Sequence, residues 1–264
     1  MQKLKIYVLT DNTASTFCKA EHGLSYLIAF DENILFDTGQ TNLFIENANF
    51  LEAPLDKVKK VVLSHGHYDH GNGLAHLNGR QLICHPDIYL KRYSGKQRKY
   101  VGLALSKAQI QERFQVTETK DPYWLSDNMV FLGEIPRKFS FEKNQAGFFL
   151  ENNQNDPLLD DSGIAVVMNQ GLFVISGCAH SGICNIVEHA RKVTGISKVY
   201  GVMGGFHLKH NNQQTQETIK YIKDLQVEVV LPSHCTALPA LAQFYNEFGG
   251  EQIKAGTLYT FDEQ

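Results

Sequence analysis

The stretch VVLSHGHYDHGNGL, residues 61–74, places three histidines and an aspartate within six positions, directly after a short apolar run. These four side chains are His65, His67, Asp69 and His70. Imidazole nitrogens and carboxylate oxygens are ligands that zinc and similar divalent ions take from proteins. Because side chains alternate along an extended chain, His65 and His67 would project to the same side and bind one ion together. Asp69 and His70 would then face a second ion beside the first.

Three later histidines also stand where apolar runs end. They are His180 in FVISGCAHSG, His207 in VMGGFHL and His234 in VVLPSHCT. A scaffold presents loop residues at one rim in this way, and a divalent ion needs about three or four protein ligands. We therefore expect these histidines to lie near the first four residues, at a site that holds two ions. Five histidines lack this context and are expected to be structural or solvated: His22, His76, His85, His189 and His210.

The composition is that of an ordinary globular protein, because 43% of its 264 residues are hydrophobic and 20% are charged. A chain of this length can bury a large core, and we expect a single domain over residues 1–264. The formal net charge of −3 gives no electrostatic reason to expect nucleic acid or an anionic membrane as a partner. No apolar run approaches the length of a membrane-spanning helix, and residues 1–15 lack the pattern of a secretory signal. These observations favour a cytoplasmic protein.

The five cysteines do not form a recognisable framework. Their number is odd and no two are spaced as Cys-x-x-Cys, which argues against both a disulfide scaffold and a structural zinc knuckle. Cys178 and Cys235 nevertheless each lie beside a candidate metal ligand. We expect the other three cysteines to be buried and chemically inert.

Each half of the chain has strand patterns followed by helix patterns. Apolar runs on either side of a short turn predict strand hairpins at residues 25–39 and 163–177. Apolar residues at helical spacing predict helices at residues 41–51, 183–193, 215–225 and 238–248. Further strands are expected at residues 58–65, 80–86, 198–205 and 227–232. This order suggests two sheets packed face to face, with helices on the outside.

The pattern loosens over residues 87–144, which we interpret as an insertion that shapes a site, since long connections in compact domains are usually functional or disordered. Its aromatic residues make disorder the poorer explanation. The stretch KRYSGKQRKYVGLALSK, residues 91–107, is rich in cations and places Arg92, Lys96, Arg98, Lys99 and Lys107 close together. They could form a solvated basic face. Alternatively, they could hold an anionic substrate while Tyr93 and Tyr100 stack on its ring.

The stretches LSHGHYDHGNGL and ILFDTG together resemble the signature of the metallo-β-lactamase superfamily. The resemblance covers nearly the whole chain. It implies an α/β fold, a four-layer αββα sandwich of two mixed sheets with flanking helices, and a dinuclear metal site at one edge. Other stretches, LFVISGCAHSGICNIVEHA, VMGGFHL, LPSHCT and LGEIPR, resemble a narrower branch. That branch includes the dihydropterin–ribofuranosylaminobenzene-phosphate synthase of methanopterin biosynthesis and many uncharacterised metal-dependent hydrolases.

The resemblance implies five metal ligands, His65, His67, Asp69, His70 and His234, to which we add His180 because it stands at the end of a strand. Members of the superfamily commonly have a histidine before the second hairpin and an aspartate after it. Here Asp160 and Asp161 stand at the first place, and Cys178 stands at the second with His180 two residues on. We favour His180 as the ligand and expect Cys178 to be dispensable for metal binding. A Cys178 thiolate ligand is the alternative. Asp161 could replace the missing histidine or could simply form a turn.

The resemblance further implies a metal-dependent hydrolase that uses a hydroxide at the dinuclear site to attack a small phosphorylated or ester-type metabolite. Asp69 would orient the nucleophile, and His207 would act as an acid or contact the substrate. Asp37 would support the metal-binding histidines from behind. Two divalent ions are expected, with zinc favoured and manganese, iron or magnesium as alternatives. The partner would be a small anionic molecule, and the oligomeric state stays open. The competing function is a transferase that joins a pterin methyl diphosphate to an aryl amine.

Overall fold

The computed structural model describes residues 3–142 and 147–262. The ends of the expected domain, residues 1–2 and 263–264, lie outside the described residues. So do Lys143 and Asn144, the last two residues of the expected insertion. Within the described ranges, no helix is long and apolar enough to cross a membrane.

The first of two large sheets has seven strands in the order β16-β1-β2-β3-β4-β5-β8. Their bounds are β1 (Lys3–Thr10), β2 (Ser25–Ala29), β3 (Asn33–Phe36), β4 (Lys60–Val62), β5 (Arg80–Cys84), β8 (Phe114–Glu118) and β16 (Leu258–Asp262). The strands from β16 to β3 pair antiparallel, and those from β3 to β8 pair parallel. The sheet is therefore mixed, as the resemblance implies.

The second large sheet has six strands in the order β15-β14-β13-β12-β10-β9. Their bounds are β9 (Tyr123–Trp124), β10 (Met129–Phe131), β12 (Gly163–Met168), β13 (Gly171–Ser176), β14 (Val199–Gly205) and β15 (Val229–Ser233). The hairpin expected at residues 163–177 is present as β12 and β13. Strands β13, β14 and β15 run parallel, so their carboxyl ends meet at one edge.

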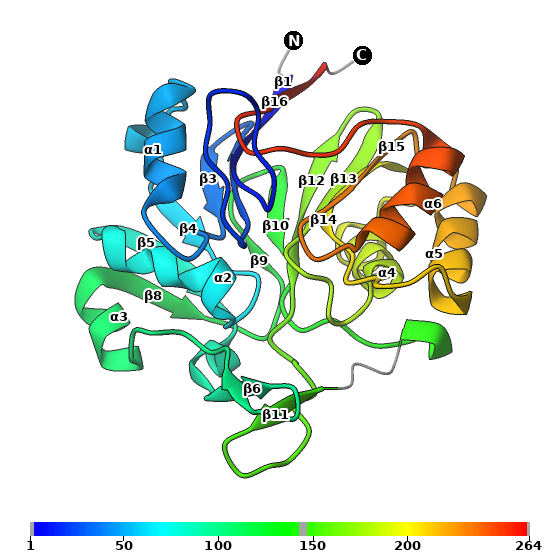
Figure 1. Ribbon diagram of the computed structural model, residues 1–264. Coiled ribbons are helices and arrows are strands. Elements are labelled where there is room, and N and C mark those ends of the chain that lie inside the picture. The colour runs from blue at the N-terminus through cyan, green and yellow to red at the C-terminus, as the bar shows by residue number, and fades with distance from the viewer. Residues whose placement is uncertain (1–2, 143–146, 263–264) are drawn as a thin grey trace.

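Helices cover the outer face of each sheet (Figure 1). Helices α1 (Leu43–Phe50) and α3 (Lys107–Arg113) lie on the first sheet, whereas α4 (Ile183–Thr194), α5 (Gln213–Asp224) and α6 (Leu238–Phe248) lie on the second. A separate apolar layer fills the space between the sheets and includes Ile6, Phe36, Phe131, Phe173 and Ile175. This arrangement confirms the four-layer αββα sandwich.

The segment expected as an insertion is shared among the layers. Its strand β8 extends the first sheet, while β9 and β10 extend the second. The remaining part, β6 (Arg92–Ser94) and β7 (Lys99–Tyr100), pairs with β11 (Phe148–Leu150) in a small three-stranded sheet. This sheet, which we call the covering sheet, lies at one end of the sandwich (Figure 1).

Four loops reach the same edge of the sandwich because their strands end there. Strand β4 leads into the histidine-rich stretch and the short helix α2 (Tyr68–Gly71). Strands β13, β14 and β15 lead to Cys178, His207 and His234. Parallel strands present their carboxyl ends at one edge, so residues far apart in sequence are brought together there.

Candidate metal centre

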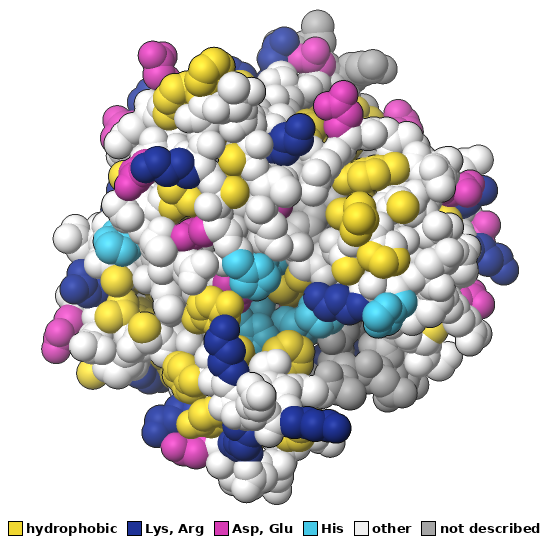
Figure 2. Space-filling view, in the orientation of Figure 1, with side chains coloured by type: hydrophobic (Ala, Val, Ile, Leu, Met, Phe, Trp, Pro, Cys, Tyr) yellow, Lys and Arg dark blue, Asp and Glu magenta, His cyan; other side chains and the backbone are white. Residues whose placement is uncertain are grey.

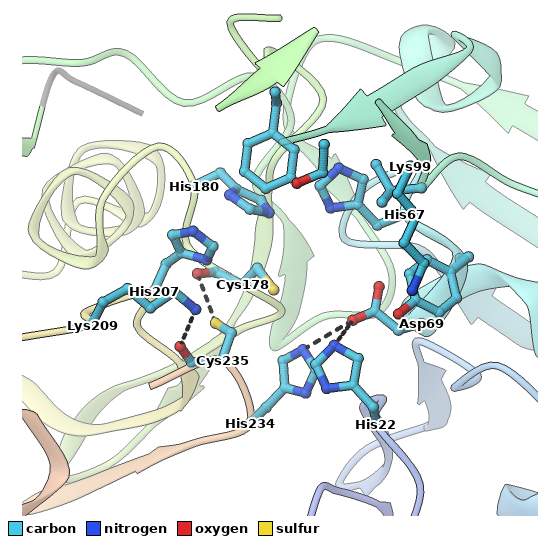
Figure 3. Close-up of a pocket in the computed structure, with 14 residues that line it drawn as sticks. His22, His67, Asp69, Lys99, Cys178, His180, His207, Lys209, His234 and Cys235 are labelled. Carbon is cyan, nitrogen blue, oxygen red and sulfur yellow. Dashed lines mark hydrogen bonds and ion pairs between the residues drawn. The ribbon is translucent and has the colours of Figure 1, made fainter. Parts of the chain in front are cut away.

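The six residues expected as metal ligands all converge and are almost fully buried. Their exposed fractions are 0% for His65, 5% for His67, 6% for Asp69, 0% for His70, 1% for His180 and 7% for His234. Four of them, His67, Asp69, His180 and His234, line a cavity of about 350 Å³, which Figure 3 shows in close-up. Charged or polar groups are rarely buried at this density unless they bind one another or a metal.

His65, His67 and His180 form the first group of ligands. The Nε2 atom of His65 lies 2.9 Å from Nδ1 of His67, and the His180 ring lies 4.9 Å and 5.0 Å from the two rings. Among the described residues, His67 Nε2 and both ring nitrogens of His180 are buried without a hydrogen-bond partner. Leaving a buried polar atom unpaired costs about 1–3 kcal/mol. A metal ion bound by one ring nitrogen of His180 would remove part of that cost, so His180 fits such an ion.

Asp69, His70 and His234 form the second group. The Nε2 atoms of His70 and His234 lie 3.1 Å apart, and Asp69 Oδ2 lies 3.6 Å from His234 Nε2. The outer nitrogens of both rings are bound elsewhere, because His70 Nδ1 lies 2.7 Å from Asp37 and His234 Nδ1 lies 3.0 Å from Asn12. The inner nitrogens are therefore held facing each other, which is the arrangement that metal-binding histidines adopt.

Cys178 lies between the two groups. Its Sγ atom is 3.2 Å from His70 Nε2. The sulfur is also within 4.8 Å of the ligand atoms of His65 and His180, and equally of those of His70 and His234. The structure thus places both Cys178 and His180 at the centre, and both side chains are available as metal ligands. Among the described residues Asp161 does not belong to a cluster of ligand atoms; its Oδ2 accepts a 2.8 Å hydrogen bond from the backbone N–H of Ser181, and its Oδ1 is buried without a partner.

Asp37 holds the first and second groups together from behind. One carboxylate oxygen accepts the backbone N–H of Ser64 at 2.7 Å, and the other lies 2.7 Å from both Ser64 Oγ and His70 Nδ1. The Ser64 hydroxyl in turn lies 2.8 Å from His65 Nδ1. Asp37 therefore orients His70 directly and His65 through Ser64.

The electrostatics of the centre favour neutral imidazoles for most of its histidines. Burial lowers the pKa of His67 to about 3 and that of His234 to about 4. Burial also disfavours the charged form of His70, but the carboxylates of Asp37 and Asp69 outweigh it and raise its pKa to about 9. Metal ions bind neutral imidazole, so among the candidate histidine ligands His70 is the one that would have to release a proton when a metal enters.

Reasoning from the sequence did not place His22 at the centre. Its Nε2 atom lies 3.1 Å from Asp69 Oδ2, and its ring lies 5.3 Å from that of His234. The only local signal is the glycine that follows it. A Cβ atom on Gly23 would lie 2.8 Å from the Asp69 carbonyl oxygen, so the His22 segment can approach the metal loop only with glycine at that position.

The walls of the cavity carry aromatic and basic side chains. The Phe148 ring lies 5.0 Å from that of His67, and the His207 ring lies 4.3 Å from that of His180. Lys99 and Lys209 line the cavity from opposite sides (Figure 3). Figure 2 shows histidines gathered in a hollow of this face, with dark-blue basic side chains beside it.

The basic stretch of residues 91–107 does not act as one surface. Lys99 lines the cavity, whereas Arg98 packs over the Tyr93 ring at 4.6 Å and donates to the carbonyl of Leu150 at 3.0 Å. Arg92 is fully buried, so the expectation of a solvated or substrate-binding cation was wrong at that position. For the exposed Lys96, Lys99 and Lys107, both alternatives stay predictions.

Comparison with known proteins shows the family of the chain. The sequence profile of the metallo-β-lactamase superfamily matches residues 19–234. The chain belongs to this superfamily. Its sequence is 33% identical to that of the 7,8-dihydropterin-6-methyl-4-(β-D-ribofuranosyl)-aminobenzene-5′-phosphate synthase of Methanocaldococcus jannaschii. The match covers 99% of this chain and 98% of that protein. The fold also matches the crystal structure of Tm1679, a metal-dependent hydrolase of the β-lactamase superfamily, with a TM-score of 0.85. That match is 30% identical and covers 97% of this chain and 98% of the other.

A buried carboxyl group behind the centre gives a prediction about pH and stability. Burial raises the pKa of Asp11 from 3.8 to about 7, although hydrogen bonds from Ser233 and Asn12 oppose the rise. A carboxyl whose pKa is higher in the folded state favours folding when protonated. Its contribution is therefore complete below pH 3.8 and is lost as the pH rises through about 7.

We expect the free energy of unfolding of Asp11→Asn to depend less steeply on pH in this window than that of the parent protein. Urea unfolding of the metal-free proteins would measure the difference, and Asp127→Asn, at an exposed aspartate, serves as the control. Parallel curves for parent and Asp11→Asn would contradict the assignment.

Proposed function

We propose that the protein is a metal-dependent hydrolase that holds two divalent ions, zinc foremost, and acts on a small anionic ester or phosphorylated metabolite. The observation that supports it best is the pair of ligand groups that share Cys178, with buried and unpartnered imidazole nitrogens in the first group. Neutral imidazoles and a thiolate are ligands that suit zinc. The cavity above them has room for a small substrate.

The two groups of residues have separate tasks in this proposal. His65, His67 and His180 would hold one ion, and Asp69, His70 and His234 the other, with Cys178 placed to contact both. Bound ions would supply Lewis acidity, which polarises a carbonyl or phosphoryl group and makes water acidic enough to react near neutral pH.

The chain's own side chains would orient the reactants. Asp69, held by His22 at 3.1 Å, faces the cavity and would accept a hydrogen bond from the attacking water. His207 lines the cavity beside His180 and would donate a proton to the leaving group. Lys99 and Lys209 would bind the negative charge of the substrate from two sides.

A charge-removal experiment tests the anionic substrate. We expect Lys99→Ala and Lys209→Ala each to raise KM about tenfold, because a hydrogen bond to a charged group contributes about 1.5–3 kcal/mol. Metal content should not change. Arg98→Ala is the matched control on the same hairpin, since Arg98 packs on Tyr93. Equal KM values for Lys99→Ala, Lys209→Ala and Arg98→Ala on an anionic substrate would argue against this binding mode.

A second candidate function has its own support. The synthase of M. jannaschii is 33% identical over 99% of this chain, which favours the transferase that joins a pterin methyl diphosphate to an aryl amine. In that reaction the same centre would stabilise a departing diphosphate. The two functions differ in their nucleophile, which is water in one and the aryl amine compound in the other.

An assay with the pterin methyl diphosphate separates the candidates. A hydrolase would release diphosphate at the same rate with and without the aryl amine. A synthase would release it only with the amine and would form the joined product. A phosphodiester, phosphomonoester, lactone and thioester panel would then identify the substrate class if the pterin compound is inert. A metal-loaded protein inactive in every one of these assays would contradict both functions.

A further inference from the structure

Arg92 lies in the covering sheet, on β6, and is fully buried. Its Nε donates to Asp156 Oδ2 at 2.7 Å, and its Nη2 donates to Asp160 Oδ1 at 2.7 Å. Both carboxylates are also almost completely buried. Taking such charges out of water costs several kcal/mol per ion, so a buried pair is weak evidence for stability alone. This cost suggests that the pair has another role.

The Asp160 carboxylate connects Arg92 to the metal loop. Its second oxygen, Oδ2, accepts a 2.8 Å hydrogen bond from the backbone N–H of Gly66, which stands between His65 and His67. A Cβ atom on Gly66 would lie 2.1 Å from the carbonyl oxygen of Ile88 and 2.6 Å from Arg92 Nη1. The guanidinium therefore packs directly against the backbone that carries two candidate ligands.

The two residues that follow β7 hold the same loop at a second place. The backbone N–H of Tyr68 donates to the carbonyl of Val101 at 3.0 Å, and His67 forms an isolated β-bridge with Gly102. Val101 is itself tied to Arg92, because its N–H donates to the Arg92 carbonyl at 2.9 Å. The loop from His65 to Tyr68 is thus held on both sides by one hairpin.

We propose that Arg92, acting through Asp160, is a positioning residue that sets the backbone between His65 and His67 and so determines how tightly the first group of ligands binds metal. The inference rests on the proposed metal centre and adds residues that do not themselves contact an ion. It also makes the covering sheet part of the metal site, since the strand that bears Arg92 belongs to that sheet.

The chemistry of Asp160 makes the proposal testable. Both of its neighbours, Gly66 N–H and Arg92 Nη2, are donors, so both of its oxygens must accept. The amide of Asp160→Asn has one acceptor oxygen and must turn its NH2 group toward one of these donors. We expect this variant to bind zinc about 10–100-fold more weakly, the usual effect of disturbing a residue behind a metal ligand.

Asp156→Asn is the matched control. Asp156 also accepts from two donors, Arg92 Nε and the backbone N–H of Leu158, but hydrogen-bonds to neither Gly66 nor its loop. We expect it to lose comparable thermal stability while its zinc affinity stays within about threefold of the parent, since only the contact with Gly66 differs. Arg92→Lys keeps the positive charge but loses the bidentate geometry of the guanidinium. Its zinc affinity should lie between those of Asp160→Asn and Asp156→Asn.

Zinc affinity would be measured by competition with a chelator, and the unfolding midpoint would be measured on the metal-free proteins. Hydrogen exchange of the Gly66 amide in metal-free protein gives a readout that needs no ion, and it should be faster in Asp160→Asn and Arg92→Lys than in Asp156→Asn. Equal zinc affinities in Asp160→Asn and Asp156→Asn would overturn the inference, as would equal exchange. If Asp160→Asn does not fold, the same comparison is made between Arg92→Lys and Asp156→Asn, and equal zinc affinities or equal exchange of the Gly66 amide in those two variants would overturn the inference. Failure of the parent to bind zinc would refute the proposed function itself.

Discussion

Replacing His67 with alanine is expected to remove most of the metal from the first group of ligands while leaving a folded protein. The Nε2 atom of His67 is buried without a partner, and its Nδ1 lies 2.9 Å from the nitrogen of His65. Loss of one imidazole leaves that group with too few ligands for a divalent ion. Activity should fall by at least about 100-fold, because even residues behind a ligand are typically worth 10–100-fold.

Elemental analysis and circular dichroism would measure the outcome. His76→Ala is the control, since His76 is exposed and lies outside the centre. The parent should contain about two ions per chain. A His67→Ala protein with the metal content of the parent would refute the first ligand group.

Removal of Cys178 is expected to affect both ions, and removal of His180 only one. The sequence favoured His180 as the ligand and treated Cys178 as dispensable, but the geometry leads us to revise that expectation. Cys178 Sγ lies within 4.8 Å of ligand atoms from both groups. Among the described residues, His180 forms such a cluster with His65 and Cys178 alone. A thiolate between two cations would stabilise both, so Cys178→Ser should weaken binding at both positions.

Cobalt substitution distinguishes these roles. A cobalt-bound thiolate gives a charge-transfer absorption, which Cys178→Ser should abolish and His180→Ala should retain. Cys235→Ser is informative because Cys235 also lies beside Cys178 and His207, and Cys18→Ser is a remote control. The earlier expectation would be restored if Cys178→Ser kept its full metal content and His180→Ala lost an ion.

Much of the fold could be predicted because it depends on periodicity within short segments. The helix predicted at residues 238–248 is found over Leu238–Phe248, and the one predicted at 183–193 is found over Ile183–Thr194. The expected hairpins are also present. Apolar side chains repeat every two or about 3.6 residues in such elements, so their local pattern carries the information.

The insertion could not be delimited in the same way. Strand β9 is only two residues long, which is too short for a periodic pattern. It joins the second sheet by pairing with β10, and β10 in turn pairs with β12, a strand farther along the chain. Such pairing is set by the complete sheet and not by the segment alone.

The sequence by itself determined the sandwich and the candidate ligands, because His65, His67, Asp69 and His70 are neighbours and the later histidines follow apolar strands. Only the tertiary structure decided that Cys178 lies between two ligand groups and that His22 reaches Asp69. It also showed that Arg92, which the sequence suggested as a surface cation, is buried. The physical reason is that the cost of burying a charge depends on its partners, and the carboxylates that compensate Arg92 lie 64 and 68 residues away in the chain.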